Sequence, residues 1–107
     1  IHVDDHCDAL NKILERGKPG EIYNIGTNNE HSNIEIANLI LEIMEESPDL
    51  ITYVDDRAGH DFRYALDTTK ARNELGFLPT KDFDTAMKET ITWYLENHQW
   101  WESKVTN

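Results

Sequence analysis

The sequence predicts an α/β protein with a small sheet of about three strands and about four helices. Stretches with apolar residues at three- and four-residue spacing predict the helices, and short apolar runs between turn residues predict the strands. The 107 residues, 38% of them hydrophobic, suffice for one domain with one core. The pattern leaves open whether the strands form a single sheet.

The N-terminal part is predicted to begin with the end of a buried strand at residues 1–3 (IHV). A helix should follow, with Asp4 or Asp5 as its N-terminal cap, because a carboxylate accepts hydrogen bonds from the free backbone N–H groups there. Gly17 is a typical helix end. The alternating run EIYNIG, residues 21–26, predicts the next strand.

The middle of the chain is predicted to hold a long amphipathic helix. Ser32 and Glu35 have the spacing of a capping box, which indicates where this helix begins. Its apolar face is wide, so we expect burial on more than one side. The helix should end near Glu46, where SPD (47–49) interrupts it, and LITYV (50–54) predicts a further strand.

The C-terminal part is predicted to contain a short extended piece at residues 62–67 and then two helices. Asp67 should cap the first of these helices, and Gly76 should end it. The last helix is expected to begin at Asp82 or Asp84.

The composition excludes several classes of partner. The formal net charge is −11, so the chain lacks the broad basic face that nucleic acids or membrane surfaces require. No apolar run approaches the roughly 20 residues that span a bilayer, and no signal peptide is recognisable, so a cytoplasmic location is expected. Cys7 is the only cysteine, which excludes an internal disulfide, and its apolar helical position predicts burial.

The loop DDRAGHD, residues 55–61, is the first candidate site. Arg57 offers a planar fork of donors that matches phosphate or carboxylate oxygens, Gly59 allows close backbone approach, and His60 can donate to a second oxygen. The alternative is a surface turn in which Arg57 pairs with one of the aspartates in the loop. We expect Arg63 to pair with nearby acidic residues.

The polar run TNNEHSN, residues 27–33, is the second candidate site. A helix N-terminus presents unpaired N–H groups that suit anions, and Asn33, just inside that helix, can recognise donors and acceptors of a base or sugar. Judged from these residues alone, an Asn-rich turn with a helix cap is the favoured interpretation.

Neither a metal site nor catalytic residues are predicted. The side chains of His2, Asp4, Asp5 and His6 could in principle ligate a metal, but a role for Asp5 as a helix cap is favoured. The sequence has no G-x-G-x-x-G motif, and no tyrosine is followed four residues later by lysine. We therefore expect no group in this chain to carry out bond-making chemistry.

The sequence resembles, over nearly its whole length, the C-terminal part of the dTDP-glucose 4,6-dehydratases, a family of extended short-chain dehydrogenase/reductases. The segments that carry the resemblance are VDDH (3–6), GEIYNIG (20–26), NIEIANLI (33–40), ITYVDDRAGHDFRYALDTTKARNELGF (51–77) and ETITWYLENHQWW (89–101). The chain departs from many relatives at Ala58, where they have proline.

This resemblance implies roles for particular residues. Arg57 would hold the diphosphate of dTDP-glucose, His60 would lie beside it, and Asn33 would contact the nucleotide portion. Residues 1–107 would be a single C-terminal sugar-nucleotide-binding region of a Rossmann-type enzyme. The start at Ile1, without methionine, also suggests an excised piece.

The resemblance further implies an NAD-dependent lyase of deoxysugar biosynthesis, which forms dTDP-4-keto-6-deoxyglucose and water. NAD would be bound by an N-terminal Rossmann domain absent from this chain, the parent protein would be a homodimer, and the 107 residues alone would be inactive. The alternatives are a related sugar-nucleotide epimerase or decarboxylase, or a stand-alone binding module without catalytic function.

Overall fold

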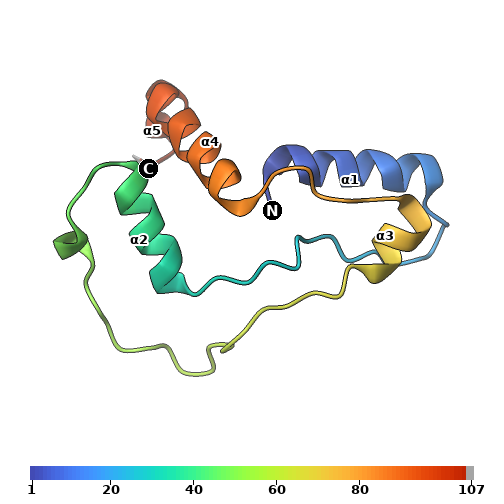
Figure 1. The fold of residues 1–107 in the computed structure, drawn as a ribbon, viewed down its shortest axis with the longest axis horizontal. Helices are drawn as coiled ribbons and strands as arrows, with labels where there is room; N and C mark the ends of the chain where they lie inside the picture. The colour runs from blue at the N-terminus through green and yellow to red at the C-terminus, as the bar shows by residue number, and fades with distance from the viewer. Residues whose placement is uncertain (106–107) are drawn as a thin grey trace. The chain divides into compact units, whose positions relative to one another are not determined.

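The computed structural model describes residues 1–105, in which the regular secondary structure is helical (Figure 1). The elements are α1 (Val3–Arg16), α2 (Asn33–Ile43), the 3-10 turn η1 (Pro48–Leu50), α3 (Thr69–Leu75), α4 (Phe83–Glu96) and α5 (His98–Val105). The chain divides into two compact units. The first unit comprises Ile1–Glu30 and Tyr53–Phe83, and the second comprises His31–Thr52 and the residues from Asp84 on.

The prediction of an α/β fold with a small sheet is wrong, since none of residues 1–105 belongs to a strand. The segments expected to form strands or extended pieces were 1–3, 21–26, 50–54 and 62–67. Alternating apolar residues favour an extended backbone, but a strand also needs a neighbour that exchanges ladder hydrogen bonds. Side chains connect two of these segments instead, because the amide Nδ2 of Asn24 donates to the carbonyl of Asp67 at 3.3 Å.

The core of the first unit lies where α1 packs against α3, and Figure 1 shows α3 at the C-terminal end of α1. Ala9 on α1 and Ala71 on α3 are both fully buried. Because an alanine side chain is only a methyl group, the two backbones can approach closely. Leu75 and Phe77 complete this core, and the half-buried side chains of Ile13, Tyr23 and Ile25 pack around it.

Polar contacts tie the end of α3 to the neighbouring segments. The Arg16 guanidinium donates from Nη1 to the carbonyl oxygen of Leu75 at 3.4 Å, which gives a partner to a carbonyl at the C-terminus of α3. The Tyr23 hydroxyl donates to the Glu74 carboxylate at 3.1 Å and accepts from the backbone N–H of Lys18 at 3.2 Å. The extended segment after α1 is therefore held against α3 without strand pairing.

Two of the predicted helix caps are displaced by a residue or more. His2 caps α1, because its Nδ1 accepts from the backbone N–H of Asp4 at 3.2 Å, so the expected cap at Asp4 or Asp5 is wrong. The N-cap position of α3 is Thr68, while the carboxylate of Asp67 accepts from the Thr69 N–H at 2.9 Å.

Other predicted helix boundaries are confirmed. Ser32 and Glu35 form the expected capping box at the start of α2. Gly76 ends α3 with a φ of +66°, a conformation that glycine adopts without steric cost. The helix expected to be the last is α4, which begins at Phe83, between the two expected starting residues, and a separate helix, α5, follows it.

The second unit contains no fully buried side chain among its described residues, so the wide apolar face of α2 is only half-buried. The turn from α4 to α5 is held by aromatic contacts. Trp93 meets Trp100 edge-on with ring centroids 5.2 Å apart, and the indole N–H of Trp101 donates to the carbonyl of Tyr94 at 2.8 Å.

The C-terminus of α2 uses a glutamate where helices usually place glycine. Glu45 has a φ of +57°, its N–H donates to the carbonyl of Glu42 at 3.2 Å, and the N–H of Glu46 donates to the carbonyl of Leu41 at 2.9 Å. These two bonds form a Schellman motif, whose left-handed residue is normally glycine. A residue with a Cβ pays a steric cost in this conformation.

We expect Glu45→Gly to stabilise the chain by up to about 1 kcal/mol, because glycine removes that steric cost. The free energy of unfolding, measured by urea denaturation, checks this value. Glu46→Gly is the matched control, since it removes the same charge at a residue with ordinary φ, and it should stabilise nothing. Equal effects of the two substitutions would contradict the steric explanation.

Candidate functional site

The loop at residues 55–61 is organised around the carboxylate of Asp56. One of its oxygens, Oδ1, accepts from the backbone N–H of Arg57 at 2.8 Å and lies 2.7 Å from Nδ1 of His60. The backbone N–H of His60 donates to the carbonyl of Arg57 at 3.3 Å, which closes a four-residue turn. Gly59 has a φ of +74° in this turn, a conformation that a side chain would strain.

The positive charge of Arg57 is not taken up by the aspartates of its own loop. Among residues 1–105, its guanidinium makes no ion pair or side-chain hydrogen bond. Asp56 is engaged by His60, and the carboxylate of Asp61 accepts from the hydroxyl of Tyr64 at 2.8 Å. The alternative surface turn, in which Arg57 pairs with a loop aspartate, is therefore not the arrangement observed.

Hydrogen bonding holds the pKa of the Asp56 carboxyl below its ordinary value. The side chain of His60 is the largest cause, and the backbone N–H of Arg57 adds to it. The ionised carboxylate can only accept hydrogen bonds, so it favours a proton on the Nδ1 that faces it. The side chain of His60 is 31% exposed, whereas that of Asp56 is 75% exposed.

Arg63 behaves as predicted and pairs with an acidic residue. Its guanidinium binds the carboxylate of Glu30 with two donors, Nε to Oε2 and Nη2 to Oε1, the second at 2.6 Å. The hydrogen bond from Arg63 is the main cause that lowers the pKa of Glu30. This pair joins the polar run that begins at residue 27 to the segment that follows the Arg57 loop.

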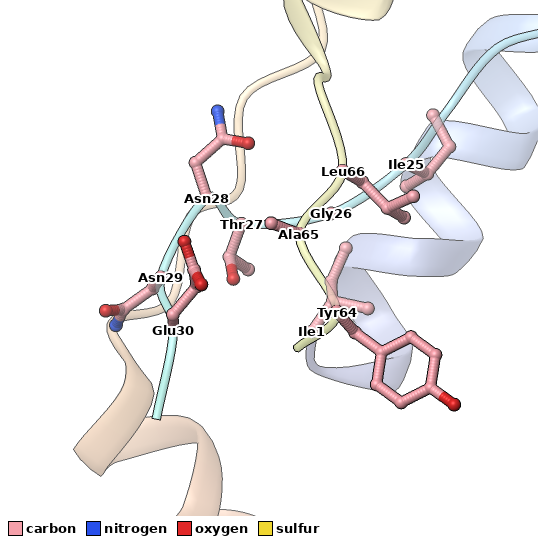
Figure 2. Close-up of a pocket in the computed structure, with 10 residues that line it drawn as sticks. All are labelled: Ile1, Ile25, Gly26, Thr27, Asn28, Asn29, Glu30, Tyr64, Ala65 and Leu66. Carbon is pink, nitrogen blue, oxygen red and sulfur yellow. The ribbon is translucent and has the colours of Figure 1, made fainter. Parts of the chain in front are cut away.

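A hollow of about 310 Å³ lies beside that connection in the first unit, as Figure 2 shows. It is lined by Ile1, Ile25, Gly26, Thr27, Asn28, Asn29, Glu30, Tyr64, Ala65 and Leu66. None of the predicted site residues lines it. The polar run 27–33 pointed to this region, but only folding brought it next to residues 64–66.

Asn33 belongs to the second unit, whereas Arg57 and His60 share one loop of the first unit. Asn33 is the first residue of α2, as predicted, and its side chain is exposed. Within residues 1–105 its amide group makes no hydrogen bond. Two of the three predicted site residues, Arg57 and His60, thus lie in one loop. The third, Asn33, belongs to the other unit.

The N-terminal acidic residues have structural partners. Asp5 is 3% exposed, and its carboxylate accepts from the N–H of Thr80 at 3.0 Å, the hydroxyl of Thr80 at 2.7 Å and the N–H of Lys81 at 3.2 Å. In the part of the chain that the structure describes, no three metal-ligating side chains come together. Over the same residues, no helix has the length and apolar character needed to cross a membrane.

A comparison with known proteins decides the family. The sequence model of the GDP-mannose 4,6 dehydratase family matches residues 1–90. The chain belongs to this family. The resemblance to dTDP-glucose 4,6-dehydratases found in the sequence is confirmed by similar proteins of that name.

Two such members of the family come from Streptomyces niveus, at 48% identity, and Sinorhizobium fredii, a probable dTDP-glucose 4,6-dehydratase at 49% identity. Each aligns with 95% of this chain. The crystal structure of DesIV, a dTDP-glucose 4,6-dehydratase from Streptomyces venezuelae with NAD and TYD bound, is 40% identical and matches 96% of the chain with a TM-score of 0.90. The chain spans only 30–32% of the length of these three proteins.

Proposed function

We propose that this chain is the sugar-nucleotide-binding region of a dTDP-glucose 4,6-dehydratase, the enzyme that forms dTDP-4-keto-6-deoxyglucose and water. The observation that carries this proposal is the unpaired guanidinium of Arg57 in a chain with a net charge of −11. An unpaired guanidinium in such an acidic chain is suited to binding a small anion from solution. The likeness to dehydratases of that name supports a nucleotide diphosphate as this anion.

Each of the three predicted residues has a distinct part in this proposal. The fork of Arg57 donors matches the oxygens of the diphosphate, and a protonated His60 adds one further donor. The amide of Asn33 offers both a donor and an acceptor to the nucleotide portion. Such contacts bind and orient the substrate, and they leave the bond-making steps to groups outside this chain.

NAD is proposed to bind to a part of the complete protein outside these 107 residues. Residues 1–105 contain no strand followed by a glycine-rich turn and a helix, the unit that holds a dinucleotide. The complete enzyme would bind NAD elsewhere, and that cofactor supplies the hydride chemistry. The 107 residues by themselves should therefore show no turnover.

The test of this function uses the complete protein and a panel of sugar nucleotides. The complete protein should convert dTDP-glucose to the 4-keto-6-deoxy product, which is detected by its absorbance in base. A related epimerase or decarboxylase would instead act on other members of the panel without forming this product. Preference for a UDP- or GDP-sugar would overturn the assignment of the nucleotide.

The outer face of α1 supports a role inside a larger protein. Val3, Cys7, Leu10 and Leu14 recur at a spacing that places them on one side of the helix. All are exposed, so the predicted burial of Cys7 is wrong for this chain. The reason is that the core of the first unit uses another side of α1, which carries Ala9 and Ile13. We propose that the NAD-binding part of the same protein covers the exposed side.

The substitution Leu14→Ala tests whether the NAD-binding part packs on the exposed side of α1. Leu14 is 85% exposed, so in the 107-residue chain the substitution should change the free energy of unfolding by less than about 0.5 kcal/mol. In the complete protein the same substitution should cost about 2–4 kcal/mol, because it would leave a cavity beneath a buried helix. Denaturant unfolding of both proteins gives the comparison. Equal, small effects would contradict the proposed cover.

A further inference from the structure

We infer that Asp56 is a positioning residue, which orients His60 so that only Nε2 of its ring is available to the sugar nucleotide. This inference rests on the proposed function, because it concerns how the same loop meets the same ligand. Asp56 itself touches no ligand in this proposal. It acts through His60 and through the backbone of Arg57.

The geometry that carries the inference is the double use of one carboxylate oxygen. Oδ1 of Asp56 holds the backbone N–H of Arg57 and the Nδ1 of His60 together, at 2.8 and 2.7 Å. An ionised carboxylate has no proton to give, so Nδ1 of His60 must carry one. A ring fixed in this way can address a ligand only from the opposite nitrogen, Nε2.

Nε2 is then a donor whenever the ring carries its second proton, which is the form that suits a phosphate oxygen. The hydrogen bond from the backbone N–H of Arg57 to Asp56 stabilises the turn that carries the Arg57 side chain. One acidic side chain therefore holds both the ring of His60 and the backbone at Arg57. This gives a physical reason for an aspartate directly before the arginine that is proposed to hold an anion.

The inference opposes what charge alone would predict. Removing a negative charge next to an anion should tighten binding of that anion. If Asp56 positions His60, its removal should weaken binding instead, because the ring and the turn lose their common acceptor. The sign of the change in affinity therefore separates the two interpretations.

The experiment measures dTDP affinity of the complete protein by calorimetry for Asp56→Ala, Asp56→Asn and Asp55→Ala. Asp56→Ala should weaken binding about tenfold, the usual effect of losing a charge-assisted hydrogen bond. Asp56→Asn keeps an acceptor oxygen and should restore most of the affinity. Asp55→Ala removes the same charge without these contacts and should leave affinity unchanged or tighter. Tighter binding by Asp56→Ala would overturn the inference.

A double-mutant cycle isolates the route through His60. In a His60→Ala background, Asp56→Ala should cost clearly less than in the wild type, because most of its effect passes through the ring. A full additive loss in that background would overturn the inference. Nitrogen NMR of the ligand-free protein, at a pH where the ring is neutral, should find the proton on Nδ1 in the wild type and mainly on Nε2 in Asp56→Ala.

Failure of this inference can be told apart from failure of the proposed function. If Arg57→Ala weakens dTDP binding but Asp56→Ala does not, the loop binds the diphosphate and Asp56 has no positioning role. If neither substitution changes the affinity, the diphosphate site itself is refuted.

Discussion

Arg57→Ala in the complete protein is expected to weaken dTDP binding by about 2–4 kcal/mol, which is roughly thirty- to several-hundred-fold. The guanidinium has no partner within residues 1–105, so the substitution breaks no internal ion pair and should leave the fold intact. The whole loss should therefore appear in ligand binding. Isothermal titration of dTDP into wild type and variant measures it.

Arg63→Ala is the matched control for this prediction. It removes the same charge six residues further along, but the Arg63 guanidinium is already held by both oxygens of Glu30. We expect Arg63→Ala to change dTDP affinity much less than Arg57→Ala does. Arg57→Lys should retain part of the affinity, because lysine keeps the charge and loses the planar fork. An unchanged affinity in Arg57→Ala would refute the diphosphate role.

Asp5→Ala is expected to destabilise the chain by about 2–4 kcal/mol, a large part of the stability of a small domain. The substitution removes the acceptor of three hydrogen bonds from Thr80 and Lys81, at a position only 3% exposed. The loss comes from the removal of a buried, charged acceptor that serves three donors, since Thr80 itself is exposed and Lys81 is only half-buried. Chemical denaturation of the chain measures the change.

Low pH should remove the stabilisation that the ionised carboxylate of Asp5 provides. Burial by itself would raise the pKa of Asp5, but the hydrogen bonds from Thr80 and Lys81 outweigh burial and hold the pKa below its ordinary value. The unfolded chain binds this proton more readily than the folded chain does, so the stabilisation is present above the unfolded pKa of about 3.9. It is lost as the pH falls through the lower, folded pKa.

Asp4→Asn is the control for Asp5. Asp4 is the neighbouring carboxylate, 71% exposed, and it pairs with Lys81 at 3.1 Å. An exposed ion pair contributes little, so this substitution should cost less than about 1 kcal/mol. Equal losses in the free energy of unfolding for the Asp4 and Asp5 variants would contradict the role assigned to burial. In Asp5→Ala, stability should fall less steeply as the pH is lowered than it does in the wild type.

Local signals in the sequence predicted the helices well. The Ser32–Glu35 capping box and Gly76 define helix ends through bonds and angles within a few residues, so they can be read without knowing the rest of the fold. The N-cap of α1 was predicted at the wrong residue because aspartate is a more common N-cap than histidine, whereas in the structure Nδ1 of His2 accepts from the N–H of Asp4. The helical start of Asn33 followed from the same local signals.

The strands could not be predicted correctly for the opposite reason. An alternating run such as 21–26 indicates an extended backbone, but pairing depends on a partner distant in the sequence. The role of Asp5 is also non-local, because its partners Thr80 and Lys81 lie 75 and 76 residues further along. The sequence placed Asp5 in the right element and assigned it the wrong contact.

By itself, the sequence determined the family, the helical segments and a loop with a cation and a histidine around a glycine. Each of these depends on residue type and short spacing. Only the tertiary structure decided which acidic residue pairs with which partner. Asp56 binds His60 and leaves Arg57 unpaired, and Arg63 binds Glu30. Asp5 binds the backbone before α4. This acidic chain has more carboxylates than cations, so the sequence allows several pairings. The distances between these groups in the folded molecule determine which pairs form.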